Sequence, residues 1–205
     1  MAVEVMDVAP PFEVMVEGKP HVAELLLPSH IIQHRVREMG AESAEHYAEL
    51  GNGVHVLTVL DGAKHFGSDI ERAMQTTRPD LVMTGDNIQI ESYAGMASSG
   101  VVRQLSKLKK PIEGLDVLVV EDILNSGNTL QWLTAYLRGH KPRSVEVVTL
   151  LNKDVLGRAS DILGEITLHT GFEIPDEFVV GYGLDYIGYY RNHGDISVLR
   201  PTQSV

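Results

Sequence analysis

The sequence predicts an α/β protein with a central, mostly parallel sheet flanked by helices. Three apolar runs rich in β-branched residues predict buried strands, at residues 54–60, 116–122 and 145–151. Helical patterns follow the first two runs, near residues 66–75 and 129–137. Because strands that alternate with helices pair in parallel, these observations predict one such sheet. A chain of 205 residues suits one hydrophobic core, so we expect a single domain over residues 1–205.

The remaining segments complete this arrangement. The N-terminal segment, punctuated by Pro10-Pro11, is expected to form a covering arm. Residues 29–50 fit an amphipathic helix loosely, with Gly40 as a candidate interruption. Residues 81–90 predict a further strand, and residues 91–102 contain so much Gly and Ser that we expect a mobile loop.

Composition excludes several classes of function. The net charge of −11 disfavours non-specific binding to nucleic acid or to anionic membrane surfaces. No apolar run approaches the roughly 20 residues of a membrane-spanning helix. The chain has no cysteine and no secretion signal at its start, so we expect a soluble, cytoplasmic protein. A local site can still bind an anionic substrate, because backbone N–H groups and a few basic side chains suffice.

Polar residues follow the predicted strands at their carboxyl ends. They are Asp61-Gly62, Glu121-Asp122 and Asn152-Lys153. In parallel sheets ligands bind beyond these ends, so the three pairs are expected to converge on one edge and form the functional site.

Residues 118–130 join a predicted strand to a predicted helix through a short polar loop that suits phosphate. Backbone N–H groups and hydroxyls at a helix N-terminus bind anions, and four loop residues can supply them: Ser126, Gly127, Asn128 and Thr129. Glu121 and Asp122 would repel a phosphate and instead suit ribose hydroxyls or a hydrated magnesium ion. Loop composition alone leaves an ordinary capped strand-loop-helix connection as an equal alternative.

The wider pattern resolves this choice. Two acids ending an apolar strand, followed by Ile-Leu-Asn-Ser-Gly-Asn-Thr-Leu, resemble the phosphoribosyl-pyrophosphate loop of type I phosphoribosyltransferases. Four further segments resemble hypoxanthine-guanine phosphoribosyltransferases in particular: VLDGAKHF, SYAGMASSGVV, LLNKD and GFEIPDEFVVGYGLDYIGYYRN. The resemblance covers residues 31–199 and implies a type I phosphoribosyltransferase-like fold with a small hood subdomain. Parts of the N-terminal arm and of the segment after about residue 171 would form the hood.

The resemblance also implies how the purine and pyrophosphate are bound. Lys153 would donate to the purine O6, Phe178 would stack on the base, and the Val179 backbone would read the ring edge. Arg191 would contact pyrophosphate, and Asp185 would bind Mg²⁺ together with Glu121 and Asp122. Taken alone, however, Phe178 is more often a core residue, and Lys153 a solvated surface lysine.

Two loops in the resemblance surround the reacting atoms. In the family, a cis peptide between the residues matching Asp61 and Gly62 turns a backbone N–H toward pyrophosphate, and Lys or Arg often replaces Asp61. Ser92 and Tyr93 match the flexible catalytic loop, whose closure would exclude water.

Asn125 departs from the family pattern, which places a catalytic Asp here, near N7 of the purine. An amide has nearly the same shape but cannot take a proton at neutral pH, so we expect binding to survive and turnover to slow. Loss of a general base typically removes about 100- to 10,000-fold in rate.

The predicted function is purine salvage, with magnesium-dependent transfer of the 5-phosphoribosyl group from phosphoribosyl pyrophosphate to hypoxanthine or guanine. Expected partners are phosphoribosyl pyrophosphate, 6-oxopurine bases and their nucleotides, and further copies of the chain in a homodimer or homotetramer. Two alternatives stay open: a nucleotide-binding protein or inactivated variant with little turnover because of Asn125, and a xanthine-preferring enzyme. His30 and His34 have metal-ligand spacing on a helix, but without a third ligand a surface-helix explanation is favoured.

Overall fold

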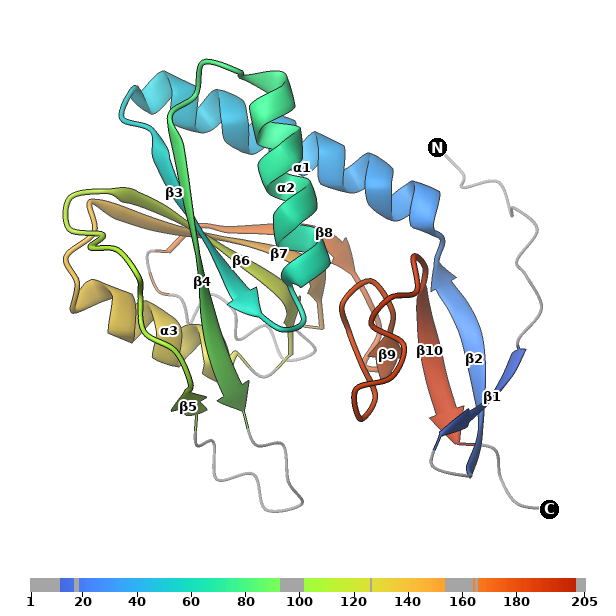
Figure 1. The fold of residues 1–205 in the computed structure, drawn as a ribbon. Coiled ribbons are helices and arrows are strands. Elements are labelled where there is room, and N and C mark those ends of the chain that lie inside the picture. Colours follow the sequence, from blue (N-terminus) through green and yellow to red (C-terminus); the bar gives the residue numbers. More distant parts are fainter. Residues whose placement is uncertain are drawn as a thin grey trace. The chain divides into compact units, whose positions relative to one another are not determined.

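The computed structural model describes residues 12–16, 19–92, 102–125, 127–153, 164 and 166–201. The chain forms two compact units. The larger unit comprises residues 34–176, and the smaller one combines residues 1–33 with residues 177–205 (Figure 1). No helix in the described ranges is long and apolar enough to cross a membrane.

A six-stranded sheet forms the centre of the larger unit. Its strands are β3 (Val54–Leu60), β4 (Met83–Ser92), β5 (Val102–Gln104), β6 (Asp116–Leu124), β7 (Ser144–Asn152) and β8 (Leu168–Glu173). They lie in the order β5-β4-β3-β6-β7-β8, and all neighbours pair in parallel except β4 and β5. The predicted parallel sheet is therefore confirmed. The central strand β3 is buried over nearly its whole length, which explains its continuous apolar sequence.

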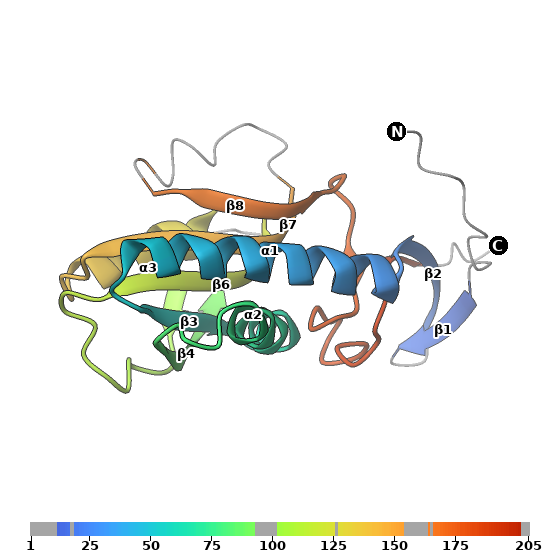
Figure 2. The same ribbon diagram turned by 90° about the horizontal axis from the view of Figure 1, so that it is seen from above.

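Helices cover both faces of this sheet. They are α1 (Ser29–Leu50), α2 (Lys64–Thr77) and α3 (Asn128–Arg138). Because neighbouring residues of a strand point to opposite faces, β6 contacts both layers. Val117 and Val119 join a core cluster with Leu130 and Leu133 of α3, whereas Leu118 faces α1. Figures 1 and 2 show α3 on the opposite side of the sheet from α1 and α2.

Gly40 does not interrupt α1, which is continuous from Ser29 to Leu50. A Cβ on Gly40 would overlap the Cβ of Ala73 in α2 and would lie 3.2 Å from the backbone nitrogen of Met74. Gly40 is therefore the place where two helices approach closely, and the predicted interruption is wrong. Periodicity alone cannot distinguish the two cases, because the partner helix lies more than 30 residues away in the sequence.

Several element boundaries differ from those predicted. Strand β4 begins at Met83 and runs to Ser92, and β6 continues to Leu124, past both acids that were expected to end it. Strand β8 was not predicted. Its residues, LHTGFE, are at most half-buried at the sheet edge and therefore show no apolar run.

The smaller unit contains an antiparallel sheet built from both ends of the chain. Its strands are β1 (Phe12–Val16), β2 (Lys19–Leu27), β9 (Val179–Val180) and β10 (Ile196–Pro201), in the order β1-β2-β10-β9. Ala23, Val180 and Leu199 form its buried core, against which Tyr186 and Tyr190 pack. Strand β2 is thus held in this unit by pairing with β10.

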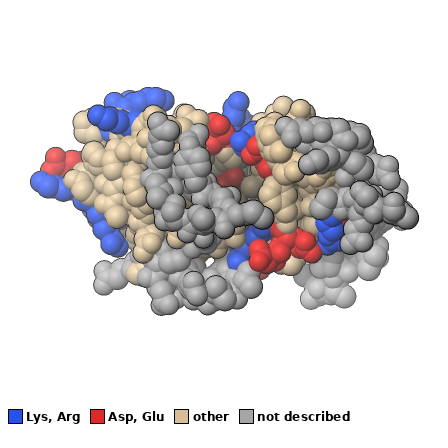
Figure 3. Space-filling view, turned by 90° about the horizontal axis from the view of Figure 1, so that it is seen from below, with Lys and Arg blue, Asp and Glu red and all other residues tan. Residues whose placement is uncertain are grey.

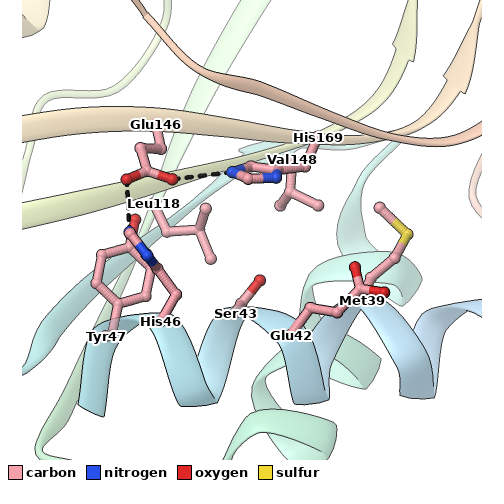
Figure 4. Close-up of a pocket in the computed structure, with 9 residues that line it drawn as sticks. All are labelled: Met39, Glu42, Ser43, His46, Tyr47, Leu118, Glu146, Val148 and His169. Carbon is pink, nitrogen blue, oxygen red and sulfur yellow. Dashed lines mark hydrogen bonds and ion pairs between the residues drawn. The ribbon is translucent and has the colours of Figure 1, made fainter. Parts of the chain in front are cut away.

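A polar cluster joins α1 to the sheet of the larger unit, beside a cavity of about 110 Å³. Figure 4 shows His46 of α1 and His169 of β8 reaching the two carboxylate oxygens of Glu146 in β7, at 2.8 Å and 2.9 Å. Hydrogen bonds from His169 and His46 hold the pKa of Glu146 below its ordinary value, although burial opposes this. The buried Tyr47 hydroxyl has no hydrogen-bond partner among the described residues, and burial raises its pKa.

Charged side chains are mixed on the molecular face in Figure 3. Lys and Arg lie there in separate groups, with Asp and Glu beside them. Among the described residues on this face, no broad surface of one sign is visible.

Candidate active site at the carboxyl edge of the sheet

The carboxyl ends of β3, β6 and β7 meet at one edge of the larger unit. Leu124 at the end of β6 lies opposite Asn152 at the end of β7, and the Lys153 N–H donates to the Leu124 carbonyl at 2.8 Å. Strand β3 lies on the other side of β6 and leads directly into Asp61 and Gly62. The three polar pairs predicted to converge therefore share this edge.

Gly62 packs directly against Asp122. A Cβ on residue 62 would overlap the Asp122 carboxylate, so only glycine permits this approach. The other carboxylate oxygen, Oδ1, accepts from the Ile123 N–H at 2.9 Å, which holds the side chain in place. The loop after β3 is thus fitted to the end of β6.

The cis peptide in this loop lies between Leu60 and Asp61, one bond earlier than predicted. Neither the observed nor the predicted cis peptide bond precedes a proline, so the residue types do not indicate where the cis bond lies. Asp61 itself is exposed.

Two helices begin at this edge without a side-chain cap. Helix α2 starts after Ala63, and α3 starts after Gly127, whose φ of 76° is left-handed. Gly127 is buried, Asn125 and Asn128 are exposed, and Thr129 is half-buried. The first N–H of α2, at Lys64, donates to the Asp61 carbonyl at 3.2 Å. The other N–H groups in a first helical turn have no intrahelical partner, so both helix ends present donors and a positive dipole end to an anion. Ser126 lies outside the described residues.

Glu121 and Asp122 have different surroundings although they are neighbours. Strand alternation directs them to opposite faces of the sheet. Asp122 is half-buried beside Gly62, whereas Glu121 is 7% exposed and its Oε2 has no hydrogen-bond partner among the described residues. Burial raises the pKa of Glu121 well above its ordinary value of 4.5, and the Asp122 carboxylate raises it further.

Lys153 is buried rather than solvated, with 7% of its surface exposed. Its Nζ lies 4.0 Å from Oδ1 of Asp176, a largely exposed carboxylate. The alternative of a solvated surface lysine is therefore wrong. An ammonium group carries three N–H donors and no acceptor.

In the smaller unit, Phe178 is 51% exposed, so the expectation of a core residue is wrong. Its carbonyl accepts from the Leu199 N–H at 2.8 Å, and the adjacent Val179 is buried and pairs with Val198. The backbone at this position is therefore held by β10 while the aromatic ring stays accessible.

Asp185 and Arg191 of the smaller unit form an ion pair of 2.8 Å. Asp185 also accepts from the Gly188 N–H at 2.6 Å, and Arg191 donates to the Gly183 carbonyl at 2.7 Å. Both side chains are about one-third exposed. The residues predicted to bind metal and pyrophosphate thus contact each other directly.

The remaining predicted residues are only partly described. Ser92 is the last residue of β4, its side chain lies outside the described part, and so does all of Tyr93. His30 and His34 are exposed on α1, which agrees with the surface-helix explanation. No three His, Asp or Glu side chains among the described residues are arranged to hold a metal ion.

Sequence reasoning missed two contacts next to predicted residues: Tyr186 against Phe178, and Asp176 near Lys153. Tyr186 lies in a segment of apolar and aromatic residues that is typical of a core. Asp176 follows a proline in a segment with no periodicity, so neither carried a local signal.

Comparison with known proteins identifies relatives that match most of the chain. Residues 25–187 match the family described as "Phosphoribosyl transferase domain". The hypoxanthine-guanine phosphoribosyltransferase of Mycobacterium avium is 41% identical over 186 residues, which cover 88% of this chain and 87% of that protein. The Bacillus subtilis enzyme of the same name is 38% identical, with 89% and 96% covered.

Solved structures give the same result. A hypoxanthine phosphoribosyltransferase from Staphylococcus aureus superposes with a TM-score of 0.75 at 37% identity, covering 87% of this chain and 91% of that one. The Trypanosoma cruzi hypoxanthine phosphoribosyltransferase, solved in complex with the product IMP, has a TM-score of 0.76 at 34% identity, with 88% and 95% covered.

Proposed function

Because the chain belongs to the phosphoribosyltransferase family, we propose that it transfers the 5-phosphoribosyl group of phosphoribosyl pyrophosphate to hypoxanthine or guanine. The products would be IMP or GMP and pyrophosphate. One observation carries this proposal: two uncapped helix N-termini begin at the same sheet edge, on either side of the contact between Gly62 and Asp122.

The donor has two phosphate-bearing ends, and this edge offers a separate place for each. The loop Asn125 to Thr129 at the start of α3 suits the 5-phosphate, because Gly127 allows close approach of the backbone. The backbone of Asp61 and Gly62 before α2 suits pyrophosphate, a ligand that the family resemblance also assigns to Arg191. Since the contact at Asp61 is made by backbone, an acidic side chain at this position is tolerated.

The acceptor is a 6-oxopurine. The buried Lys153 ammonium donates to O6, which favours an oxo group over an amino group at this position. Phe178 stacks on the base with its exposed ring, and the backbone of Val179 binds the ring edge.

Asp122 and Asp185 have the chemistry that Mg²⁺ requires, because both are partly exposed carboxylates. Glu121 fits this role less well, since it is buried, and its unpartnered Oε2 suits a ribose hydroxyl donor instead. When bound, Mg²⁺ would offset the negative charge of the pyrophosphate leaving group.

In the reaction, the bond from C1′ to pyrophosphate breaks, the bond from C1′ to N9 forms, and the proton that the purine loses passes to the pyrophosphate leaving group. The loop that carries Ser92 and Tyr93 would exclude water from C1′. Asn125 occupies the general-base position and cannot accept the proton, so turnover proceeds mainly through positioning and electrostatic stabilisation.

Steady-state formation of IMP and GMP, measured with magnesium, tests the proposal. The unaltered chain should turn over slowly, and Asn125→Asp should be about 100- to 10,000-fold faster. Equal rates for the two proteins would show that Asn125 does not limit turnover. No product from either would refute the transferase activity itself.

The preferred base and the oligomeric state each need a separate measurement. Competition among hypoxanthine, guanine and xanthine would test the proposed preference for the first two bases. We also propose a homodimer or homotetramer, which a mass measurement in solution would test.

A further inference from the structure

Phe178 needs a defined orientation if it is to stack on a purine, as the proposed function requires. With half of its side chain exposed, the ring would be free to occupy several rotamers unless a neighbour selected one. Its neighbour is Tyr186: the two ring centroids are 5.6 Å apart and the rings are nearly perpendicular, at 82°. This edge-to-face arrangement is the favoured geometry for an aromatic pair.

Tyr186 is itself firmly held. It begins a tight turn in which Tyr186 and Tyr189 exchange backbone hydrogen bonds of 3.2 Å and 2.9 Å. The two central residues, Ile187 and Gly188, have φ of 52° and 82°, as in a type I′ turn. The Gly188 N–H also donates to the side chain of Asp185, the residue before the turn, at 2.6 Å, and this bond further stabilises the turn.

The Tyr186 ring is supported from a second direction. It lies 5.2 Å from the ring of His21, which is buried in β2. It also packs against the core of the smaller unit. Three rings from three separate segments therefore form a row, His21, Tyr186 and Phe178, of which only the last is largely exposed.

We infer that Tyr186 is a positioning residue for the purine, which holds Phe178 in the orientation that stacks on the base. It acts through Phe178 and need not touch the substrate. Removing it would allow the Phe178 ring to occupy other rotamers. Part of the free energy of purine binding would then offset the entropy lost when the ring is ordered again, so the purine would bind more weakly.

Calorimetric titration with IMP and with ribose 5-phosphate tests this inference, and it does not depend on turnover. In Tyr186→Leu the Kd for IMP should rise about three- to tenfold, whereas the Kd for ribose 5-phosphate, which lacks the base, should stay unchanged. Tyr186→Phe keeps the ring and should bind IMP as the unaltered chain does. Tyr189→Leu is the matched control, because Tyr189 lies in the same turn and its ring faces Tyr190.

A double variant separates positioning from general damage. Adding Tyr186→Leu to Phe178→Leu should not weaken IMP binding further, because the ring to be positioned is already gone. Tyr186→Met serves the same purpose if the leucine variant does not fold.

Three results would overturn the inference. The first is that Tyr186→Leu binds IMP as the unaltered chain does although Phe178→Leu binds it more weakly. The second is that the losses of the two single variants add in the double variant. The third is that Tyr186→Leu weakens binding of ribose 5-phosphate as much as binding of IMP. If Phe178→Leu itself leaves IMP binding unchanged, the purine-stacking role fails instead, and with it the premise taken from the proposed function.

Discussion

Gly62 and Asp122 lie so close that any side chain at residue 62 would overlap the Asp122 carboxylate. This contact joins the loop after β3 to the end of β6, although the two residues are far apart in the sequence. It places the backbone proposed to bind pyrophosphate next to the carboxylate proposed to bind magnesium.

Gly62→Ala should therefore displace Asp122, lower stability by about 1–3 kcal/mol through overpacking, and weaken binding of phosphoribosyl pyrophosphate about 10- to 100-fold. Thermal unfolding and calorimetric titration measure the two effects. Gly85→Ala is the control, because its Cβ would lie 3.2 Å from the movable end of Glu71. In Gly62→Ala with Asp122→Ala, stability should recover while donor binding stays weak. A double variant as unstable as Gly62→Ala would contradict the proposed clash.

Lys153→Met should weaken binding of IMP and GMP about 10- to 100-fold, because the proposed charge-assisted hydrogen bond to O6 would be lost. Binding of ribose 5-phosphate should be unchanged, since this ligand has no base. Calorimetric titration of the three ligands distinguishes these effects, with the exposed Lys110→Met as control. Equal weakening of ribose 5-phosphate would mean that Lys153 supports the fold rather than the purine.

Glu121→Gln should stabilise the unliganded protein at neutral pH. The pKa of Glu121 is higher in the folded than in the unfolded protein, so its ionised form destabilises the fold. This destabilisation begins at the unfolded pKa of 4.5 and increases as pH rises through the folded pKa. The variant removes this charge, and its Tm at pH 7 should exceed that of the unaltered chain by about 2–4 °C for each kcal/mol gained. Below pH 4 the two proteins should unfold alike. Glu113→Gln, at a largely exposed carboxylate, is the control; an equal gain there would argue for a general effect of net charge.

Glu146→Gln should have the opposite dependence on pH. Because the histidines lower the folded pKa of Glu146, the ionised carboxylate contributes stability above its unfolded pKa of 4.5, and this contribution is lost as pH falls through the folded value. At pH 7 the free energy of unfolding of Glu146→Gln should be about 1 kcal/mol below that of the unaltered chain. This value is small because both histidines are partly exposed, and the difference should be smaller still near pH 3. Chemical denaturation across this range measures it. His34→Ala, on the exposed side of α1, should change little; a difference that persists at pH 3 would refute the ionic contribution.

Local patterns in the sequence carried most of the fold and part of the site. The apolar runs at β3, β6 and β7 could be recognised because each strand is buried on both faces. Strand β8 and the two-residue β9 could not, since one is half-buried and the other is too short for a pattern. The purine-binding roles that the resemblance implies for Lys153 and Phe178 stay predictions. The alternatives drawn from residue type alone, a solvated lysine and a core phenylalanine, were both wrong.

The sequence by itself determines the parallel sheet, the edge at which its polar residues gather and the presence of an amide rather than a carboxylate at Asn125, because these depend on residue type and local periodicity. Only the tertiary structure decides that Glu121 is buried while Asp122 is not, that Gly62 packs against a carboxylate, and that Tyr186 supports Phe178. Each of these depends on neighbours brought together by folding, so no local sequence pattern contains it.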